Sequence, residues 1–369
     1  MRIGTLPVIG GAVGLLGAAA AAGVAQQRRT AVRDRARIDP KSAAGLGSAP
    51  VDRQRVLHTG DGLRLHTEEV GAPDAPLTVL YVHGYTLHLG SFDFQRRTLA
   101  AEFDGRLRQV LFDLRSHGRS EHSPAEDCTI EQLGRDLHQV IEQLVPTGPL
   151  VLVGHSMGGM TVMALASQQP ELFAAGGRVR GVALINTSSG DLRNLSLGLP
   201  GALARLPAAV LPLVLRRAAR SARLVERGRA LGKDLAWAMT KRLSFADPAV
   251  DPAVVAYCTN MIAATPVTVV AEFFPTLMAH DGRLGLRNLT GCPVLVVGAD
   301  HDALTPVEHS ERIAQALPAA KLVVAPMSGH LLMLEHPELV NAPLRDLVAS
   351  ALAGVKPGRA SGRPAAGRR

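Results

Sequence analysis

Six short apolar runs, separated by longer stretches with a helical pattern, restrict the fold of this 369-residue chain more than any other feature. Such runs are typical of strands buried on both faces of a sheet, and helices between successive strands imply parallel pairing. The sequence therefore predicts an α/β fold with a mostly parallel central sheet and helices on both of its faces. The six runs lie at residues 78–82, 108–112, 149–153, 181–186, 293–297 and 321–325.

Three further patterns place elements around these runs. Residues 53–70 form two alternating stretches about a Thr-Gly-Asp-Gly turn, which predicts a hairpin at the edge of the sheet. Residues 130–144 carry one apolar helical stripe, and Thr129 with Gln132 forms a capping-box pattern at its start. The pattern of residues 190–289 is helical throughout, so we expect a helical cap inserted after the sixth strand.

Two features of the cap have alternative interpretations. Residues 206–231 are rich in Leu and Ala and contain six Arg, which favours the solvated face of a cap helix over contact with a membrane surface. The large apolar residues of the cap recur at helical spacing, so we expect them in the core rather than around a substrate pocket. These residues are Trp237, Tyr257, Met261, Phe273, Phe274 and Met278.

The N-terminal segment, residues 1–27, contains an uncharged run at residues 5–25. As a helix this run would span about 31 Å, the thickness of a bilayer core. Five Arg follow it closely and only Arg2 precedes it, which favours a membrane anchor that leaves the body in the cytoplasm. The small-x-small triplet at residues 23–25 leaves a cleaved signal segment and secretion as the alternative.

The positive charge of the chain is concentrated at its two ends. Of the formal net charge of +8, residues 1–40 carry +4 and residues 355–369 carry +5, so the segment between them is close to neutral. A near-neutral body argues against a nucleic-acid partner, and no pattern specifies an oligomeric state. We interpret residues 28–50 as a basic linker, residues 51–354 as one large domain and residues 355–369 as a disordered basic tail.

The run at 149–153 leads directly into Gly154-His155-Ser156-Met157-Gly158, followed by a helix of small residues. This context predicts a tight strand-to-helix turn that lifts a Ser156 hydroxyl out of the sheet as a nucleophile. The positions two before and two after Ser156 must be small in such a turn, and both are Gly. The following helix directs its N-terminal N–H groups at whatever the hydroxyl attacks.

A serine hydroxyl needs a nearby base, and the base needs an acid to orient it. Asp300 and Asp302 follow the run at 293–297, and His330 follows the run at 321–325. Because the carboxyl ends of parallel strands meet at one edge of a sheet, we expect these loops to converge on Ser156. His330 is the predicted base. The three scattered cysteines provide neither a disulfide framework nor a metal site.

Three more motifs complete the pattern: His83-Gly84-Tyr85 after the first run, residues 113–120 (DLRSHGRS), and Gly329-His330 followed by Glu335 and Pro337. With these, residues 53–352 resemble α/β-hydrolase-fold enzymes of the esterase, lipase and haloperoxidase-like type. The resemblance implies that the backbone N–H groups of Tyr85 and Met157 form an oxyanion hole. It also favours Asp302, three residues before Thr-Pro, as the triad acid, with Asp300 as the alternative.

The resemblance also narrows the chemistry. Dehalogenases and epoxide hydrolases of this fold carry Asp where this chain has Ser156, so acyl chemistry is expected, without cofactor or metal. The leading prediction is a serine hydrolase that cleaves small or lipid-like carboxylic esters with an apolar acyl group through an acyl-enzyme. Thioesterase, perhydrolase or haloperoxidase-like, C–C hydrolase and acyltransferase activities use the same triad and remain alternatives. A catalytically silent, membrane-associated binding protein is the alternative from another class.

Overall fold

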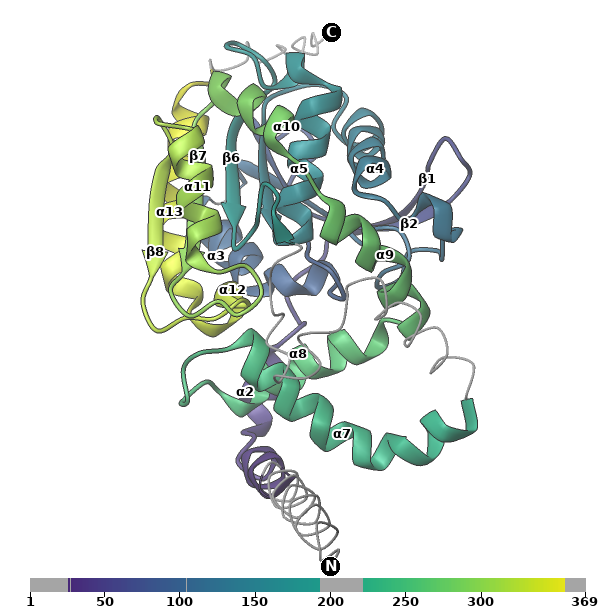
Figure 1. The fold of residues 1–369 in the computed structure, drawn as a ribbon. Coiled ribbons are helices and arrows are strands. Elements are labelled where there is room, and N and C mark those ends of the chain that lie inside the picture. Colours follow the sequence, from purple (N-terminus) through teal and green to yellow (C-terminus); the bar gives the residue numbers. More distant parts are fainter. Residues whose placement is uncertain (1–25, 27, 104, 193–221, 356–369) are drawn as a thin grey trace, which may run out of the picture.

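The computed structural model describes residues 26, 28–103, 105–192 and 222–355, with the side chains of residues 222–231 left out (Figure 1). Its core is an eight-stranded sheet in the order β1-β2-β4-β3-β5-β6-β7-β8. The predicted hairpin pairs antiparallel and joins β4 antiparallel, whereas β4, β3, β5, β6, β7 and β8 are parallel neighbours. The predicted mostly parallel α/β sheet is therefore confirmed. The strands are β1 (Arg53–His58), β2 (Arg64–Val70), β3 (Leu77–Val82), β4 (Leu107–Phe112), β5 (Leu150–His155), β6 (Val179–Ile185), β7 (Val294–Ala299) and β8 (Lys321–Ala325).

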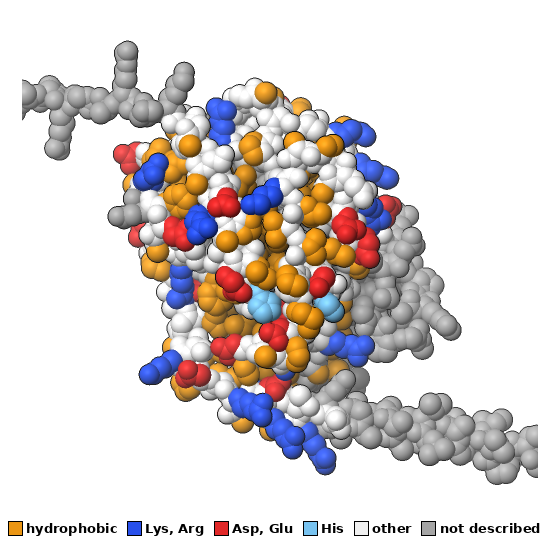
Figure 2. Space-filling view, turned by 90° about the vertical axis from the view of Figure 1, so that its left-hand side faces the viewer, with side chains coloured by type: hydrophobic (Ala, Val, Ile, Leu, Met, Phe, Trp, Pro, Cys, Tyr) orange, Lys and Arg blue, Asp and Glu red, His pale blue; other side chains and the backbone are white. Residues whose placement is uncertain are grey.

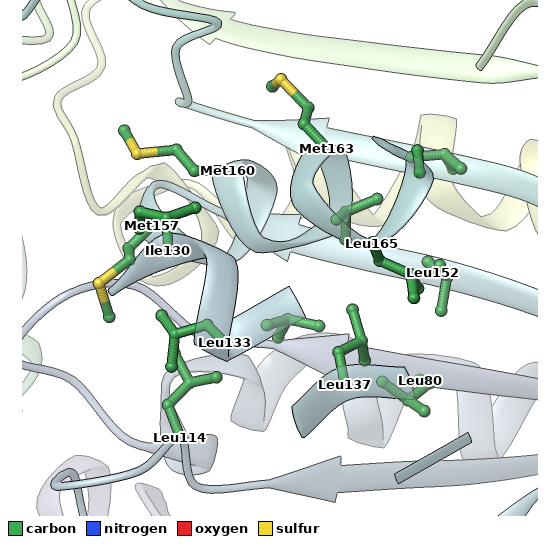
Figure 3. Close-up of a cluster of buried hydrophobic side chains, with 14 of the residues drawn as sticks. Leu80, Leu114, Ile130, Leu133, Leu137, Leu152, Met157, Met160, Met163 and Leu165 are labelled. Atoms are coloured by element: carbon green, nitrogen blue, oxygen red, sulfur yellow. The ribbon is translucent and has the colours of Figure 1, made fainter. Parts of the chain in front are cut away.

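Helices cover both faces of the sheet, and for this reason β3, β4, β5 and β7 are buried along their whole length. On one face α4 (Ile130–Leu144) and α5 (Met157–Gln168) pack over β3 and β5, with Leu133, Leu137 and Leu165 above Leu80 and Leu152 (Figure 3). The other face is covered by α3 (Asp93–Phe103) and α13 (Pro337–Ala353). Successive strand residues face opposite layers, which is why uninterrupted apolar runs mark these strands.

The helix α4 begins as its sequence predicts. The Thr129 hydroxyl accepts the backbone N–H of Gln132 at 3.1 Å and caps the helix. The Gln132 side chain donates to Asp136 at 3.0 Å instead of turning back to the cap residue, so only half of a capping box is formed. The fully buried guanidinium of Arg115 also donates two hydrogen bonds to the carboxylate of Asp136, and these bonds hold the loop after β4 against the helix.

The region between β6 and β7 is mostly helical where it is described. Three of its helices, which we call the cap, lie beyond the carboxyl ends of the strands: α7 (Ala222–Ser244), α8 (Pro252–Ala264) and α9 (Val267–Ala279) (Figure 1). The next helix, α10 (Arg283–Asn288), packs against α5 and returns the chain to the sheet. The whole of the Arg-rich stretch at 206–231 lies outside the residues whose side chains are described.

Residues 28–50, which we call the arm, are more ordered than the linker that composition suggests. Residues 28–35 are helical, and a short helix α2 (Pro40–Gly45) follows and contacts α8. Ala31 is buried against the cap, and Asp234 of α7 pairs with Arg28 and Arg35 of the arm. A helix this short is marginal in water by itself, so its order comes from packing on the cap.

The face of the molecule drawn in Figure 2 carries charges of both signs, as expected for a near-neutral body. On the side of the molecule that carries β8 and α13, Figure 2 shows basic and acidic side chains interspersed with apolar ones. The predicted N-terminal anchor and the C-terminal tail lie outside the described residues. Within the described residues no single helix has the length and apolar character of a membrane span, and α8 with α9 reaches them only as a pair bent by 90°.

Candidate active site

A sharp turn between β5 and α5 carries Ser156. Its backbone has φ 51° and ψ −119°, a left-handed conformation that non-glycine residues rarely adopt. A Cβ on Gly158 would lie 1.9 Å from the carbonyl oxygen of Val82, and one on Gly154 would lie 2.7 Å from that of Gly158. Both flanking glycines are therefore required for the turn, which places Ser156 at the N-terminal end of α5.

His330 and Asp302 meet at the same edge of the sheet, in the loops after β8 and β7. Nδ1 of His330 lies 2.8 Å from Oδ2 of Asp302, and both residues are buried. Oδ1 of Asp302 accepts the backbone N–H groups of Leu304 at 2.8 Å and Thr305 at 2.9 Å. The Thr305 hydroxyl also donates to Oδ2 at 2.8 Å. These bonds fix the carboxylate in the orientation that faces the imidazole.

The carboxyl group of Asp302 is poised to stay ionised. Burial opposes its charge, but the charge and hydrogen bond of His330 and two backbone N–H groups outweigh burial, so its pKa lies below the usual value. An ionised carboxylate at this distance holds the Nδ1 proton of His330 and leaves Nε2 as the atom that can accept a proton.

Asp300, the alternative acid, is exposed at the end of β7. Its Oδ1 lies 2.7 Å from Nδ1 of His301 and accepts the backbone N–H of Ser328 at 3.3 Å. Its bonds serve the loop and not the ring of His330. Of the two carboxylates, the structure therefore brings Asp302 to the histidine.

Ser156 and His330 open onto one cavity of about 450 Å³. Within the described residues the Ser156 hydroxyl makes no hydrogen bond to His330, and such contacts often tighten only when substrate is bound. Cap side chains form much of the wall, and none of the described lining residues is Asp, Glu, Lys or Arg. Among the cap residues that line it are Met239, Leu243, Ile262, Ala263, Phe274 and Leu277.

The cap residues expected in the core divide between core and cavity. Phe274 and Met278 line the cavity. Trp237, Met261 and Phe273 are buried in the core clusters, as expected. Tyr257 is half-buried and donates its hydroxyl proton to the carbonyl of Gly90 at 3.1 Å. Only tertiary packing separates these roles, because all of these residues recur at the same helical spacing.

Two backbone N–H groups stand where the resemblance places an oxyanion hole. Neither Tyr85 nor Met157 donates its backbone N–H to another group in the described part of the chain. A Cβ on Gly84 would lie 3.1 Å from Cβ of Ser156, so the loop after β3 closely approaches this serine. The Tyr85 hydroxyl donates to the carbonyl of Val270 on α9 and ties this loop to the cap. The loop that carries Tyr85 and the start of α5 that carries Met157 thus both adjoin Ser156.

Comparison with known proteins agrees with this arrangement. A model of the alpha/beta hydrolase fold family matches residues 78–337. The chain belongs to this α/β-hydrolase family. This is the family that the sequence motifs resemble.

Individual relatives of this hydrolase include esterases and a lipase. The pimeloyl-acyl-carrier-protein methyl ester esterase of Nitrosomonas europaea is 28% identical over 284 residues, 74% of this chain and 95% of that enzyme. A thermophilic esterase from Thermogutta terrifontis is 29% identical with a TM-score of 0.62, covering 81% of this chain and 99% of the esterase. The sn-1-specific diacylglycerol lipase of Mus musculus is 38% identical over 100 residues, which span 31% of the lipase. The chain is accordingly a hydrolase of the esterase type.

The sequence motifs did not identify two further residues of this hydrolase that hold the histidine in place. The carbonyl of His330 lies 2.9 Å from Nε2 of His155, and Nδ2 of Asn186 donates to it at 3.1 Å. Burial lowers the pKa of His155 to about 3, with a further contribution from neighbouring His330, so its ring is neutral and Nε2–H can donate. His155 is the variable position of the elbow motif, and Asn186 merely ends an apolar run, so neither carried a signal.

No group of three or more His, Cys, Asp or Glu residues in the described part of the chain is arranged to hold a metal ion. The three cysteines are free thiols, two buried and one partly buried.

Proposed function

We propose that this hydrolase cleaves carboxylic esters with an apolar acyl group, using Ser156 as nucleophile, His330 as base and Asp302 as the orienting acid. The observation that carries the proposal is the buried Asp302–His330 pair at 2.8 Å, which opens with Ser156 onto a cavity of about 450 Å³ without charged lining residues among those described. A small-molecule site of this size lies within the usual range for substrates.

The proposed reaction has two halves. Nε2 of His330 removes the proton from Ser156 as Oγ attacks the ester carbonyl, and the proton then passes to the leaving alcohol. The N–H groups of Tyr85 and Met157 stabilise the oxyanion that forms. A water molecule, activated by the same histidine, then releases the acid from the acyl-enzyme. Asp302 stabilises the imidazolium in both halves.

The acyl group is proposed to lie in the cap side of the cavity. Most of the described wall there consists of Met, Leu, Ile, Val, Ala and Phe side chains, against which a hydrocarbon chain can lose its hydration favourably, and its polar members, Thr240, Ser244 and Thr259, are uncharged. A charged acyl group would have to lose its hydration without an ion partner among the described lining residues. Neutral acyl chains are therefore the favoured substrates, and a lipid-like ester fits this requirement.

A membrane location is proposed from sequence alone. The uncharged residues 5–25 with five Arg just behind them support an anchor that leaves the catalytic domain in the cytoplasm, and a cleaved signal segment is the alternative. An anchored enzyme would meet lipid-like esters at the bilayer surface.

Replacement of the nucleophile tests the proposed function. In a p-nitrophenyl ester series of increasing acyl length, Ser156→Ala should lower turnover by about 10³-fold or more and abolish fluorophosphonate labelling, because the mutant lacks the attacking oxygen. Ser91→Ala is a matched control, since Ser91 is fully buried and its hydroxyl has no partner in the described part of the chain. Both variants should keep the circular dichroism spectrum of the parent.

Labelling of Ser156→Ala at the parent rate would exclude this nucleophile. Activity of the parent on thioesters or peracid formation, without ester hydrolysis, would favour one of the alternative activities with the same triad. The labelled band also tests the anchor, which requires it in the membrane fraction of cells; a mature chain that begins at Gln26 outside the cytoplasm would favour the cleaved signal.

A further inference from the structure

Glu335, at the end of α12 (Leu332–Glu335), joins two segments that are far apart in the sequence. Oε2 accepts the backbone N–H of Gly329 at 2.6 Å. Oε1 accepts the backbone N–H groups of Ala246 and Asp247, each at 2.7 Å. Within the described residues Glu335 forms no ion pair, so its carboxylate is committed to these three backbone donors. Hydrogen bonds to an ionised acceptor are about twice as strong as neutral ones.

One of the two segments carries the base. Gly329 precedes His330, and the carbonyl groups of both residues and the N–H of Gly329 each have a hydrogen-bond partner. The Gly329 carbonyl accepts from Asn186 at 2.9 Å, and the His330 carbonyl accepts from His155 and Asn186. Glu335 holds the remaining N–H of Gly329. The direction in which the His330 side chain leaves the backbone is thus determined by these contacts.

The other segment is the end of the cap helix α7. Residues 246–247 follow its last residue, Ser244, which lines the cavity together with Leu243. The backbone N–H of Leu331 donates to the Ser244 carbonyl at 2.9 Å. A Cβ on Gly329 would lie 2.7 Å from Cα of Phe245, so the two backbones touch. Glu335 therefore holds the histidine loop, residues 328–331, and the end of α7 together, and we call its three hydrogen bonds the clamp.

We propose that Glu335 is a positioning residue that sets the place of His330 relative to Ser156 and holds the α7 wall of the acyl cavity in register with it. The inference rests on the proposed function, in which His330 is the base. Glu335 does not orient the imidazole itself, because Asp302 occupies Nδ1 and Glu335 bonds only backbone. Movement of the cap and placement of the base are coupled through this one carboxylate.

Glu335→Gln tests the coupling with a nearly isosteric change. An amide turns an NH₂ group toward backbone donors, so at least one side of the clamp opens. We expect turnover of the acetyl ester to fall by about 10- to 100-fold, since a shift of the base by about 1 Å has effects of this size. We also expect KM to rise for longer acyl chains and not for acetyl, because the α7 wall moves. Glu338→Gln is the matched control, with a side chain 68% exposed.

The kinetics of two variants, Glu335→Gln and Glu335→Asp, decide between a positioning role and a purely structural role. Unchanged turnover and chain-length preference in folded Glu335→Gln would overturn it and leave Glu335 a role in stability alone. If Glu335→Gln does not fold, Glu335→Asp keeps the charge with a shorter reach, and it should lose part of the turnover of the parent; parent-like kinetics would overturn the inference.

The rate of fluorophosphonate labelling separates this inference from the proposed function. Labelling reports on activation of Ser156 by His330 whatever the natural substrate is. A parent that labels but cleaves no ester contradicts the proposed function, and a slower label in Glu335→Gln would still support the positioning role. Equal labelling rates in the parent and in Glu335→Gln would contradict the positioning role, even if the parent cleaves esters.

Discussion

At the scale of single residues, two aspartates in one loop have opposite environments. Asp302 is buried, accepts two backbone N–H groups and faces His330, whereas Asp300 is exposed and bonds His301 and Ser328. The loop turns tightly after β7, with the N–H of Asp302 donating to the carbonyl of Ala299 at 3.3 Å. The two carboxylates are only two residues apart in the sequence. Because of this turn, Asp302 contacts His330, whereas the Asp300 carboxylate bonds to residues of the loops.

Exchanging each of these carboxylates for an amide should separate their roles. We expect Asp302→Asn to lower kcat by about 10²- to 10⁴-fold at an intact fold, because an amide cannot hold the imidazole in the required tautomer and charge state. Asp300→Asn, the matched control from the same loop, should keep kcat and alter only the thermal midpoint. Steady-state kinetics and thermal unfolding of both variants provide the check; loss of turnover in Asp300→Asn alone would reverse the assignment.

At the scale of elements, α7 is held between the arm and the histidine loop. Trp237 of α7 is buried, and the guanidinium of Arg35 lies 5.6 Å from the centre of its ring. Lys241 pairs with Asp34 at 2.8 Å, one turn further along the same helix. The opposite side of α7 lines the cavity with Met239 and Leu243. The arm thus supports this wall of the cavity from behind.

Removal of the Trp237 ring should loosen that wall without touching the triad. Such a large-to-small change costs about 3–5 kcal/mol of packing where the site cannot collapse. In Trp237→Ala we expect KM for long acyl esters to rise by about tenfold while kcat for the acetyl ester stays close to the parent value. Leu235→Ala, on the same helix but 51% exposed, is the control. Identical chain-length profiles in Trp237→Ala and the parent would contradict support by the arm.

At the scale of the whole molecule, burial strongly lowers the pKa of four histidines in the described part of the fold. Burial is the main cause in each case, and it holds the pKa of His83 well below its usual range and lowers those of His117, His155 and His280 to about 4, 3 and 4. The unfolded chain takes up these protons near its ordinary pKa of 6.5, whereas the folded chain does so only at lower pH. The contribution of these neutral histidines to the free energy of unfolding is therefore fully present above about pH 6.5. It is lost as the pH falls toward 4.

Urea unfolding at pH values from 7 to 5 measures this linkage. Each buried histidine should lower the free energy of unfolding by about 1.4 kcal/mol per pH unit in the acidic part of this window. His280→Gln, outside the cavity, should reduce the slope by one such increment, because this variant has no imidazole to protonate at that position. A slope that does not differ between His280→Gln and the parent would show that His280 takes up its proton alike in both states.

Local patterns were sufficient for much of this protein. The strands, the edge hairpin and the helix at 130–144 follow from apolar runs, alternation and a helical stripe, because both faces of each inner strand need apolar cover. The elbow at Ser156 follows from its two glycines, since any Cβ there would collide with neighbouring backbone. Loops at the carboxyl ends of parallel strands also had to converge, so His330 was expected near this serine.

Tertiary structure alone decided the rest. Composition suggested a linker for the arm, but its contacts with α7 and α8 make it helical, and no local pattern encodes a surface some 200 residues away. The hold of His155, Asn186 and Glu335 on the histidine loop likewise depends on strand ends and a cap helix that meet only in the fold. Hydrogen bonds between distant backbone and side-chain groups leave no period in the sequence, because each depends on where two separate elements come to lie.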